Sequence, residues 1–322
     1  MLTAVVIGHE AEVLSQSGLT YTYVDSVDGR LSGVSTVSVI GHPVKHTVKK
    51  GDTLLDIARH YGLGFNEMED LYPEMDPWLP PEGKELIIPS MWVLPQADRS
   101  GIVVNIAELR LYHFLVGQSF KKNSGNNFHE KFENDFSDTQ FARTYPVGIG
   151  DEKFTTPAGQ FRVDEKRTRP FWYIPPSLQE KYAPVTIVPP GPDNPLGGYF
   201  MGIGDAYGIH GTNNPWSVGR LVTHGCIRLY PEDMESLYYA ISVGTPVQII
   251  YEPVKIGIRN GKIYMEVHRD IYNRIADFYQ YSFRKLSDSG LINDVDTGRF
   301  EAELKRKSGM PVEVGSIGMS RN

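Results

Sequence analysis

The sequence predicts a mainly β protein, in which short strands build a sandwich or a barrel, joined to a small βααβ module. Two observations predict this fold class. From residue 102 onward, short runs of β-branched and aromatic residues alternate with glycine, proline and asparagine, which is typical of strands and turns. Within residues 44–89, apolar residues recur at helical spacing. With 322 residues, the chain has room for two domains, each with its own core.

The N-terminal segment, residues 1–43, alternates polar and apolar side chains, as in the run from Thr20 to Val24. This alternation predicts two or three strands. The pattern indicates no particular role for them.

Residues 44–89 read as strand, helix, helix, strand. Gly51-Asp52-Thr53 provides a helix N-cap, and Gly62 provides the stop. A second helical turn is expected at 66–71, and a strand at 86–89. The residues that predict the first helix are Leu54, Ile57, Ala58 and Tyr61.

The next segment, residues 102–252, is predicted to be the main β domain. Expected strands lie at 102–106, 110–114, 145–150, 159–163 and 247–251. Prolines concentrate in residues 170–195, which predicts an ordered but irregular excursion. Residues 231–240 are expected to form a short helix, with Met234, Leu237 and Tyr238 on its inner face. Residues 117–143 look like an insertion, either a flap with one apolar stripe (Phe128, Phe132 and Phe136) or an ordinary surface hairpin.

Residues 253–322 are predicted to form a hairpin, a helix and a polar tail. Asn260-Gly261 is a strong type I′ turn signal at the tip of a hairpin over 255–267. Apolar residues at helical spacing predict a helix over 270–286. The last thirty or so residues are polar, and we expect them to be poorly ordered.

The strongest functional signal is the single cysteine, Cys226, with His210 sixteen residues upstream. An imidazole can take the proton of a thiol, and the resulting ion pair would hold the sulfur anionic near neutral pH. His224 is the competing base, but on a strand a position two residues away leaves little freedom to aim a nitrogen at the sulfur. A zinc site made of these three residues is the alternative, although no acidic general base lies near them.

Neighbouring residues complete the predicted site. Gly225 and Cys226 are the best candidates to offer backbone amides to a developing oxyanion. Arg228 could hold a substrate carboxylate in bidentate fashion, or form a structural salt bridge. Tyr207 and Trp216 could line the cleft, with ordinary packing as the alternative.

His210-Gly211 followed by Thr223-His224-Gly225-Cys226-Ile227-Arg228 resembles the signature of the L,D-transpeptidases, and the likeness extends over residues 102–252. The resemblance implies a β-sandwich-like catalytic domain without metal or cofactor. It implies that Cys226 attacks the carbonyl of the third residue in a donor stem tetrapeptide and expels D-alanine. The family pattern assigns proton transfer to His210, and His224 would then shape the pocket or form local hydrogen bonds. A third group should orient the His210 ring, either the backbone carbonyl of Gly211 or an acid.

The Gly51-Asp52-Thr53-Leu54 opening and the βααβ pattern of residues 44–89 resemble the LysM module, which binds glycans that contain N-acetylglucosamine. The alternative is a generic helical hairpin. The expected partners are therefore peptidoglycan stem peptides and glycan strands. The acceptor would be the amine of a second stem peptide, which gives a 3→3 cross-link, or an outer-membrane lipoprotein. The rival functions are a hydrolase on the same scaffold and a non-enzymatic wall-binding protein.

Composition excludes several other classes. The chain is 40% hydrophobic and 22% charged, which excludes wholesale disorder. Its net charge of 32 − 39 = −7 argues against nucleic acid as a partner. The absence of a long apolar run predicts no membrane span, and a single cysteine excludes an intrachain disulfide. The resemblance implies the periplasm or cell envelope. The first residues do not read as a secretory signal, so we expect a trimmed or misplaced start.

Overall fold

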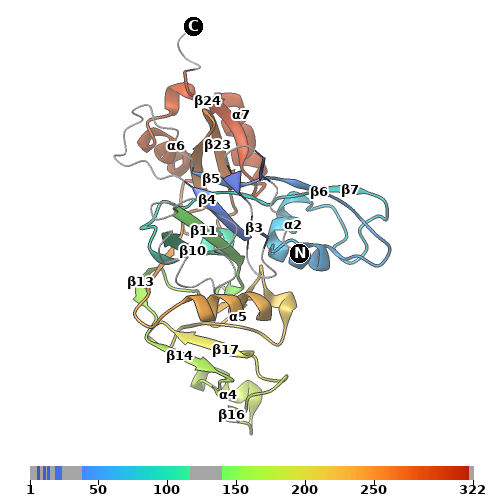
Figure 1. Ribbon diagram of the computed structural model, residues 1–322, viewed down its shortest axis with the longest axis vertical. Coiled ribbons are helices and arrows are strands. Elements are labelled where there is room, and N and C mark those ends of the chain that lie inside the picture. The colour runs from blue at the N-terminus through green and yellow to red at the C-terminus, as the bar shows by residue number, and fades with distance from the viewer. Residues whose placement is uncertain are drawn as a thin grey trace.

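The computed structural model describes residues 6–7, 10–11, 13–14, 19–23, 38–116 and 140–318. Three units pack together: a central β unit, the small helical module beside it, and a C-terminal unit at the opposite end from β14 and β17 (Figure 1). Strands outnumber helices, so the predicted mainly β class is confirmed. None of the described helices is long and apolar enough to cross a membrane.

The small module has the predicted order of elements. It consists of β6 (Val44–Thr47), α1 (Leu54–His60), α2 (Phe65–Leu71) and β7 (Glu85–Ile88), with β6 and β7 paired antiparallel. The Oγ1 of Thr53 accepts a hydrogen bond from the Asp56 amide at 3.0 Å and so caps α1. Gly62 follows the helix with a φ of +65°, which a glycine adopts without strain.

The central unit contains a seven-stranded sheet in the order β13-β21-β9-β10-β11-β4-β3. Only the pairing of β21 with β9 is parallel. Because β4 pairs with β11, the N-terminal segment contributes strands to the edge of this sheet. The strands are β3 (Val13–Leu14), β4 (Leu19–Tyr23), β9 (Gly101–Asn105), β10 (Arg110–Val116), β11 (Gln140–Pro146), β13 (Gly159–Arg162) and β21 (Pro246–Ile250).

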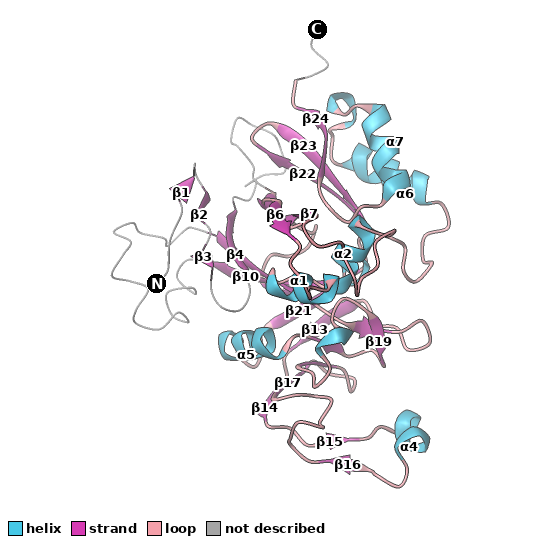
Figure 2. Ribbon diagram, turned by 90° about the vertical axis from the view of Figure 1, so that its right-hand side faces the viewer, coloured by secondary structure: helices cyan, strands magenta, loops and turns pink. Residues whose placement is uncertain are grey.

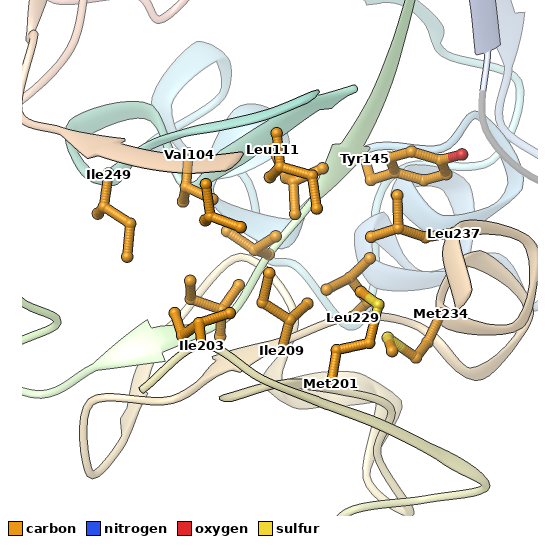
Figure 3. Packing of buried hydrophobic residues seen from close by; sticks show 14 of the residues in the cluster. Val104, Leu111, Tyr145, Met201, Ile203, Ile209, Leu229, Met234, Leu237 and Ile249 are labelled. Carbon is orange, nitrogen blue, oxygen red and sulfur yellow. The ribbon is translucent and has the colours of Figure 1, made fainter. Parts of the chain in front are cut away.

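A second sheet of four strands, β14-β17-β18-β20, faces the first, and the main core lies between them. Figure 3 shows side chains of the large sheet, such as Val104 and Ile249, pointing toward Ile203 and Ile209 of the opposite layer. Helix α5 (Pro231–Ala240) packs at the side of this core through Met234 and Leu237, as predicted. Complete burial of each such side chain stabilises the fold by about 1.5–3 kcal/mol. The strands are β14 (Glu165–Thr168), β17 (Tyr199–Gly202), β18 (Gly208–His210) and β20 (Ile227–Arg228).

The proline-rich excursion projects from the end of the second sheet (Figure 2). It contains a two-stranded hairpin, β15 (Trp172–Tyr173) with β16 (Ile187–Val188), and the short helix α4 (Pro176–Tyr182). The buried amide of Asn194 donates to the carbonyl of Pro170 at 2.8 Å and closes the base of the excursion. The expectation of an ordered, irregular segment is confirmed.

The C-terminal unit corrects two expectations. The predicted hairpin is present as β22 (Val254–Arg259) and β23 (Lys262–Val267), with Asn260 and Gly261 at positive φ. The helix predicted over 270–286 is wrong at its start, because α6 (Phe278–Asp288) begins eight residues later. The carboxylate of Asp270 accepts the amides of Arg274 and Ile275 and holds a turn there instead.

The expectation of a poorly ordered tail is also wrong. The polar C-terminal stretch forms α7 (Thr297–Arg306) and β24 (Val312–Ser316), and β24 pairs with β23. A few apolar side chains in this stretch, Phe300, Leu304 and Val314, suffice to bury it against the hairpin and α6. Their stripe is narrow, and the surrounding polar residues conceal it in the sequence.

A buried ionic network joins the three units. Lys255 of the C-terminal unit contacts the carboxylate of Glu108 in the central unit and lies 2.9 Å from Glu266. Arg110 of β10 lies 2.5 Å from Glu67 of the small module. All five side chains are buried. The small module and the C-terminal unit are therefore fixed to the central sheet by charge pairs as well as by packing.

The remaining elements are short. They are β1 (Val6–Ile7), β2 (Glu10–Ala11), β5 (Val39–Gly41), β8 (Met91–Val93), η1 (Ile106–Glu108), β12 (Ile149–Gly150), η3 (Pro215–Ser217), β19 (Leu221–Thr223) and η4 (Ile292–Asp294). The predicted insertion begins outside the described residues, where its three phenylalanines lie, and its last residues, 140–143, belong to β11.

Candidate active site

His210 and Cys226 are positioned by neighbouring strands of the second sheet. Strands β18 and β20 run parallel, with Ile209 opposite Ile227 and His210 opposite Arg228. Side chains alternate along a strand, so the two isoleucines enter the core while His210 and Arg228 share the other face. Cys226, two residues before Arg228, points to that same face. Sequence positions sixteen apart thus meet on one surface.

That surface borders a cavity of about 610 Å³. Five of the predicted site residues line it: Tyr207, His210, His224, Cys226 and Arg228. The proline-rich excursion supplies much of the opposite wall, including Trp172 and Tyr182. Such a volume is typical of a site for a small molecule or a peptide.

His210 is buried and held in a defined orientation. Its Nδ1 lies 2.6 Å from the carbonyl oxygen of Gly211. If Nδ1 donates this hydrogen bond, Nε2 of the neutral ring is left as an acceptor. The ring also stacks on Phe200, with 6.4 Å between the ring centroids. Burial lowers the pKa of His210 to about 3, with a smaller contribution from the positive charge of Arg228, so the imidazole is neutral at physiological pH.

The electrostatics of Cys226 differ from the expectation. Burial raises the pKa of the Cys226 thiol, and this exceeds the opposing effects of a hydrogen bond with the Gly208 backbone and of the nearby Arg228. A neutral thiol therefore lies in the same cavity as a neutral imidazole. Both pKa shifts oppose the resting ion pair expected from the sequence, because burial penalises both charged forms.

The turn that carries Cys226 has an internal hydrogen-bond network. The Oγ1 of Thr223 donates to the carbonyl of Cys226 at 2.6 Å and accepts the amide of Gly225 at 3.2 Å. The Gly225 amide, predicted to serve an oxyanion, thus has a partner within the turn. Gly225 has a φ of +99°, and a Cβ there would lie 2.5 Å from the Tyr207 ring, so glycine is required.

Thr156 is a residue that the sequence analysis missed. It is buried, and its Oγ1 donates to the carbonyl of Gly225 at 3.0 Å while accepting the amide of Gly150 at 2.9 Å. The hydroxyl of Tyr272, from the C-terminal unit, donates to the carbonyl of Gly150 at 2.6 Å. These bonds attach the cysteine turn to its surroundings. A threonine that precedes a proline is the only sign of this residue in the sequence.

His224 and Trp216 occupy different positions from His210. The His224 ring stacks on Phe154 at 4.4 Å between centroids, at the edge of the cavity. Trp216 lies outside the cysteine cavity, in an adjacent one, where it faces Trp78 of the small module. The expectation that Trp216 lines the cysteine cleft is therefore wrong.

Arg228 is a partly buried cation without a salt bridge to any described residue. Its Nε atom is buried and has no hydrogen-bond partner within the described chain. Burial lowers the pKa of Arg228, but the ordinary pKa of a guanidinium is so high that the group stays charged. The alternative of a structural salt bridge is thus not seen among the described residues, and the guanidinium can pair with an anionic ligand.

The zinc alternative is not supported by the geometry. Within the described ranges, the group of possible metal ligands that lies close together is Glu108, Glu266 and His268, and it includes none of His210, His224 and Cys226. The ammonium of Lys255 already occupies that group. It is an ion-pair network.

A thiol, a neutral imidazole and an unpaired guanidinium that border one open cavity are typical of enzymes with a cysteine nucleophile. Comparison with known proteins narrows this class. A family model of the L,D-transpeptidase catalytic domain matches residues 99–249, and a LysM domain model matches residues 46–73.

Two curated relatives align along most of their length. The chain is 35% identical over 319 residues to the probable L,D-transpeptidase ErfK/SrfK of Escherichia coli strain K12, covering 94% of this chain and 93% of the relative. It is 32% identical over 291 residues to the probable L,D-transpeptidase YbiS of the same strain, covering 86% and 88%. The NMR structure of the catalytic domain from E. faecium L,D-transpeptidase is similar over 48% of this chain and 100% of that one, with 20% identity and a TM-score of 0.33.

This chain belongs to the L,D-transpeptidase family. It is a cell-wall transpeptidase with an N-terminal LysM domain that binds peptidoglycan. It acts in the cell envelope.

Proposed function

We propose that Cys226 is the nucleophile that accepts the acyl group of a donor stem tetrapeptide, and that His210 moves the proton. One observation carries this proposal: His210 at the end of β18 and Cys226, directly before the neighbouring strand β20, border one cavity. The Gly211 carbonyl holds the imidazole through Nδ1, which leaves Nε2 to serve the thiol.

The first step forms a thioester. The Cys226 sulfur attacks the carbonyl carbon of the third residue, a C–S bond forms, and the thiol proton moves to Nε2 of His210. Collapse of the intermediate breaks the C–N bond to D-alanine, whose amine takes that proton. Because both groups are neutral at rest, proton transfer accompanies attack and does not precede it.

The second step releases the product. An acceptor amine attacks the thioester and gives its proton to His210. The C–S bond then breaks, a new amide forms, and the proton returns to sulfur. The acceptor is either the amine of a second stem peptide or that of an outer-membrane lipoprotein, since the donor chemistry is the same for both.

The neighbouring residues have positioning and binding roles in this proposal. Arg228 pairs with a carboxylate of the stem peptide, and Tyr207 borders the reacting carbon. The amides of Gly225 and Cys226 bind the oxyanion, and Gly225 exchanges its Thr223 partner when substrate enters. His224 shapes the pocket rim through its contact with Phe154. The substrate is periplasmic peptidoglycan, and no cofactor takes part in the steps.

Mass spectrometry of muropeptides after incubation with the purified full chain tests this function. New 3→3 cross-linked dimers, or lipoprotein peptides joined to muropeptides, are expected when the corresponding amine is supplied. The Cys226→Ala variant should give none. Trimmed monomers alone, in the presence of either amine, would replace the transferase with a hydrolase.

A further inference from the structure

A second cavity, of about 670 Å³, lies between the LysM module and the catalytic unit. The module contributes Leu55 and Trp78, and the catalytic unit contributes the rest of the wall. The cavity adjoins the cysteine cavity, and six residues line both: Trp172, Lys181, Tyr182, Pro195, Val222 and Arg228. A ligand that extends beyond the stem peptide can therefore contact the walls of both cavities.

Two exposed indoles face each other across this junction. Trp78 of the LysM module is 56% exposed, Trp216 of η3 is 43% exposed, and their ring centroids lie 6.4 Å apart at 65°. Large aromatic side chains are usually buried, because each removes a large apolar area from water. Trp78 and Trp216 stay exposed, belong to different domains and border one cavity. This combination indicates a surface that a ligand covers.

Both indoles are held by ordered loops. The amide of Trp78 donates to Asp76 at 2.8 Å, and the carbonyl of Pro77 accepts the amide of Leu54 at the start of α1. On the other side, the Oγ of Ser217 donates to the carbonyl of Asn214 at 2.5 Å and closes the turn around Trp216. The site is therefore largely formed before a ligand arrives, which lowers the entropy cost of binding.

The LysM module is also fixed to the catalytic unit. Arg59 of α1 makes two hydrogen bonds to Glu232 of α5, at 2.8 and 2.9 Å. The hydroxyl of Tyr230 donates to the carbonyl of Leu63 at 3.1 Å. A Cβ on Gly64 would lie 2.9 Å from the Cα of Gly219, so the two backbones touch. These contacts set the distance between Trp78 and Trp216.

The remaining wall supplies polar groups. Asp193, Asn213 and Asn214 offer carboxylate and amide groups at the rim. The guanidinium of Arg220 stacks on Phe65, and its Nε is buried without a hydrogen-bond partner among the described residues. Aromatic faces combined with a few fixed donors and acceptors suit an amphipathic ligand. A pyranose ring has an apolar C–H face and a polar hydroxyl and acetamido edge.

We propose that this second cavity binds the amino sugar that carries the donor stem peptide, with the edge-to-face pair of Trp78 and Trp216 forming the apolar surface that its ring contacts, at the junction of the LysM module and the catalytic unit. The inference rests on the proposed function, because the sugar is linked to the stem peptide that Cys226 would attack, and the second cavity shares lining residues with the cysteine cavity. The LysM module then has two roles: it retains the protein on the cell wall, and it orients the glycan strand that carries the donor peptide.

Binding to full-length Cys226→Ala protein tests this without turnover. Three probes are compared by calorimetry: the free stem tetrapeptide, the same tetrapeptide on its N-acetylglucosaminyl-N-acetylmuramic acid disaccharide, and the peptide-free disaccharide. We expect the disaccharide to tighten tetrapeptide binding about tenfold or more. Adding Trp78→Ala or Trp216→Ala should each remove most of that gain and weaken the peptide-free disaccharide.

Leu79→Ala is the matched control, because Leu79 is 77% exposed beside Trp78 and lines neither cavity. It should keep the full gain. Equal affinity for the tetrapeptide with and without sugar would overturn the proposal. So would a Trp216→Ala protein that keeps the gain, since the module would then bind sugar without the catalytic unit. A sugar preference in the Cys226→Ala protein, combined with no acyl-enzyme when the protein that keeps Cys226 is given the same donor, would instead contradict the proposed function alone.

Discussion

At the residue scale, burial sets the protonation of the reacting pair. The thiol of Cys226 has a raised pKa and the imidazole of His210 a lowered one, and the first cause of both shifts is desolvation. A substrate that completes the cavity brings its own carbonyl dipole and leaving amine to the proton transfer. The site can therefore keep an unreactive thiol until the donor peptide is bound.

The alkylation rate of Cys226 by iodoacetamide should report this state. Because the thiolate is the reacting form and its pKa is raised, the rate should be low at pH 7 and still be rising above pH 9. The chain has no other cysteine, so loss of free thiol measures this site directly. A plateau reached near neutral pH would show a resting thiolate and contradict the expectation.

The two histidines should differ in their effect on acylation. His210→Ala removes the proton acceptor. We expect the rate of acyl-enzyme formation to fall by a factor of about 1,000 or more, because nucleophile and base act as a unit. His224→Ala, the matched control in the same cavity, should cost far less, since His224 contacts Phe154 at the rim. Intact-protein mass spectrometry of the acyl-enzyme over time measures both rates. The reverse order of losses would move the base to His224.

At the element scale, the cysteine turn depends on a strand end and on the C-terminal unit. Tyr272 donates to the Gly150 carbonyl, Gly150 donates to Thr156, and Thr156 donates to the carbonyl of Gly225. The C-terminal unit therefore reaches the nucleophile through three hydrogen bonds. This gives a positioning role to a segment that lies outside the matched catalytic domain.

Tyr272→Phe should lower kcat several-fold with little change in the KM for the donor. The substitution removes one hydrogen bond, worth about 1 kcal/mol, and loosens the turn without altering the cavity wall. Tyr279→Phe is the matched control, because Tyr279 lies on α6 of the same unit and its ring stacks on Phe283, away from the chain of hydrogen bonds to Gly225. Steady-state kinetics on a soluble donor muropeptide separate the two variants. Equal losses in both would indicate a general packing effect.

The LysM module is an element that cannot be removed cleanly. Its α1 and α2 share a core with the central sheet, where Leu54 and Met68 belong to the same cluster as Val103 and Tyr112. Deletion of residues 44–89 would expose that core to water. Point variants of exposed residues such as Trp78 therefore test wall affinity better than a truncation.

At the scale of the whole molecule, the buried network around Lys255 joins the C-terminal unit to the catalytic unit. Lys255 also donates to the carbonyl of Val93 at 2.7 Å, in the strand that follows the LysM module. His268 lies 2.7 Å from Glu266, and the Val93 amide donates to the same carboxylate at 2.6 Å, so with Lys255 this carboxylate has three nitrogen partners. Charges buried in this way stabilise a structure only while all partners are present.

Lys255→Met should destabilise the full chain by about 3–5 kcal/mol, because it leaves Glu108 and Glu266 buried without their cation. Lys262→Met is the matched control, since Lys262 pairs with Glu313 in an exposed ion pair and should change stability little. Urea unfolding followed by tryptophan fluorescence measures both. A Lys255→Met protein as stable as the control would mean that the carboxylates are protonated in the folded state.

Local patterns in the sequence determined the elements that depend on near neighbours. The N-cap at Thr53, the stop at Gly62 and the turn at Asn260-Gly261 act within a few residues, and the structure has all three. The chemistry proposed for the site also came from local sequence, because a histidine, a glycine and a lone cysteine in one motif indicate a cysteine nucleophile with a nearby base.

Tertiary structure decided what depends on residues far apart in the chain. Burial of Phe300 and Leu304 orders a tail that reads as polar, and Trp216 faces Trp78 across a domain boundary. The neutral state of Cys226 and His210 likewise follows from desolvation by surrounding elements. Solvent exclusion and electrostatic fields are properties of the packed molecule, so no stretch of sequence contains them by itself.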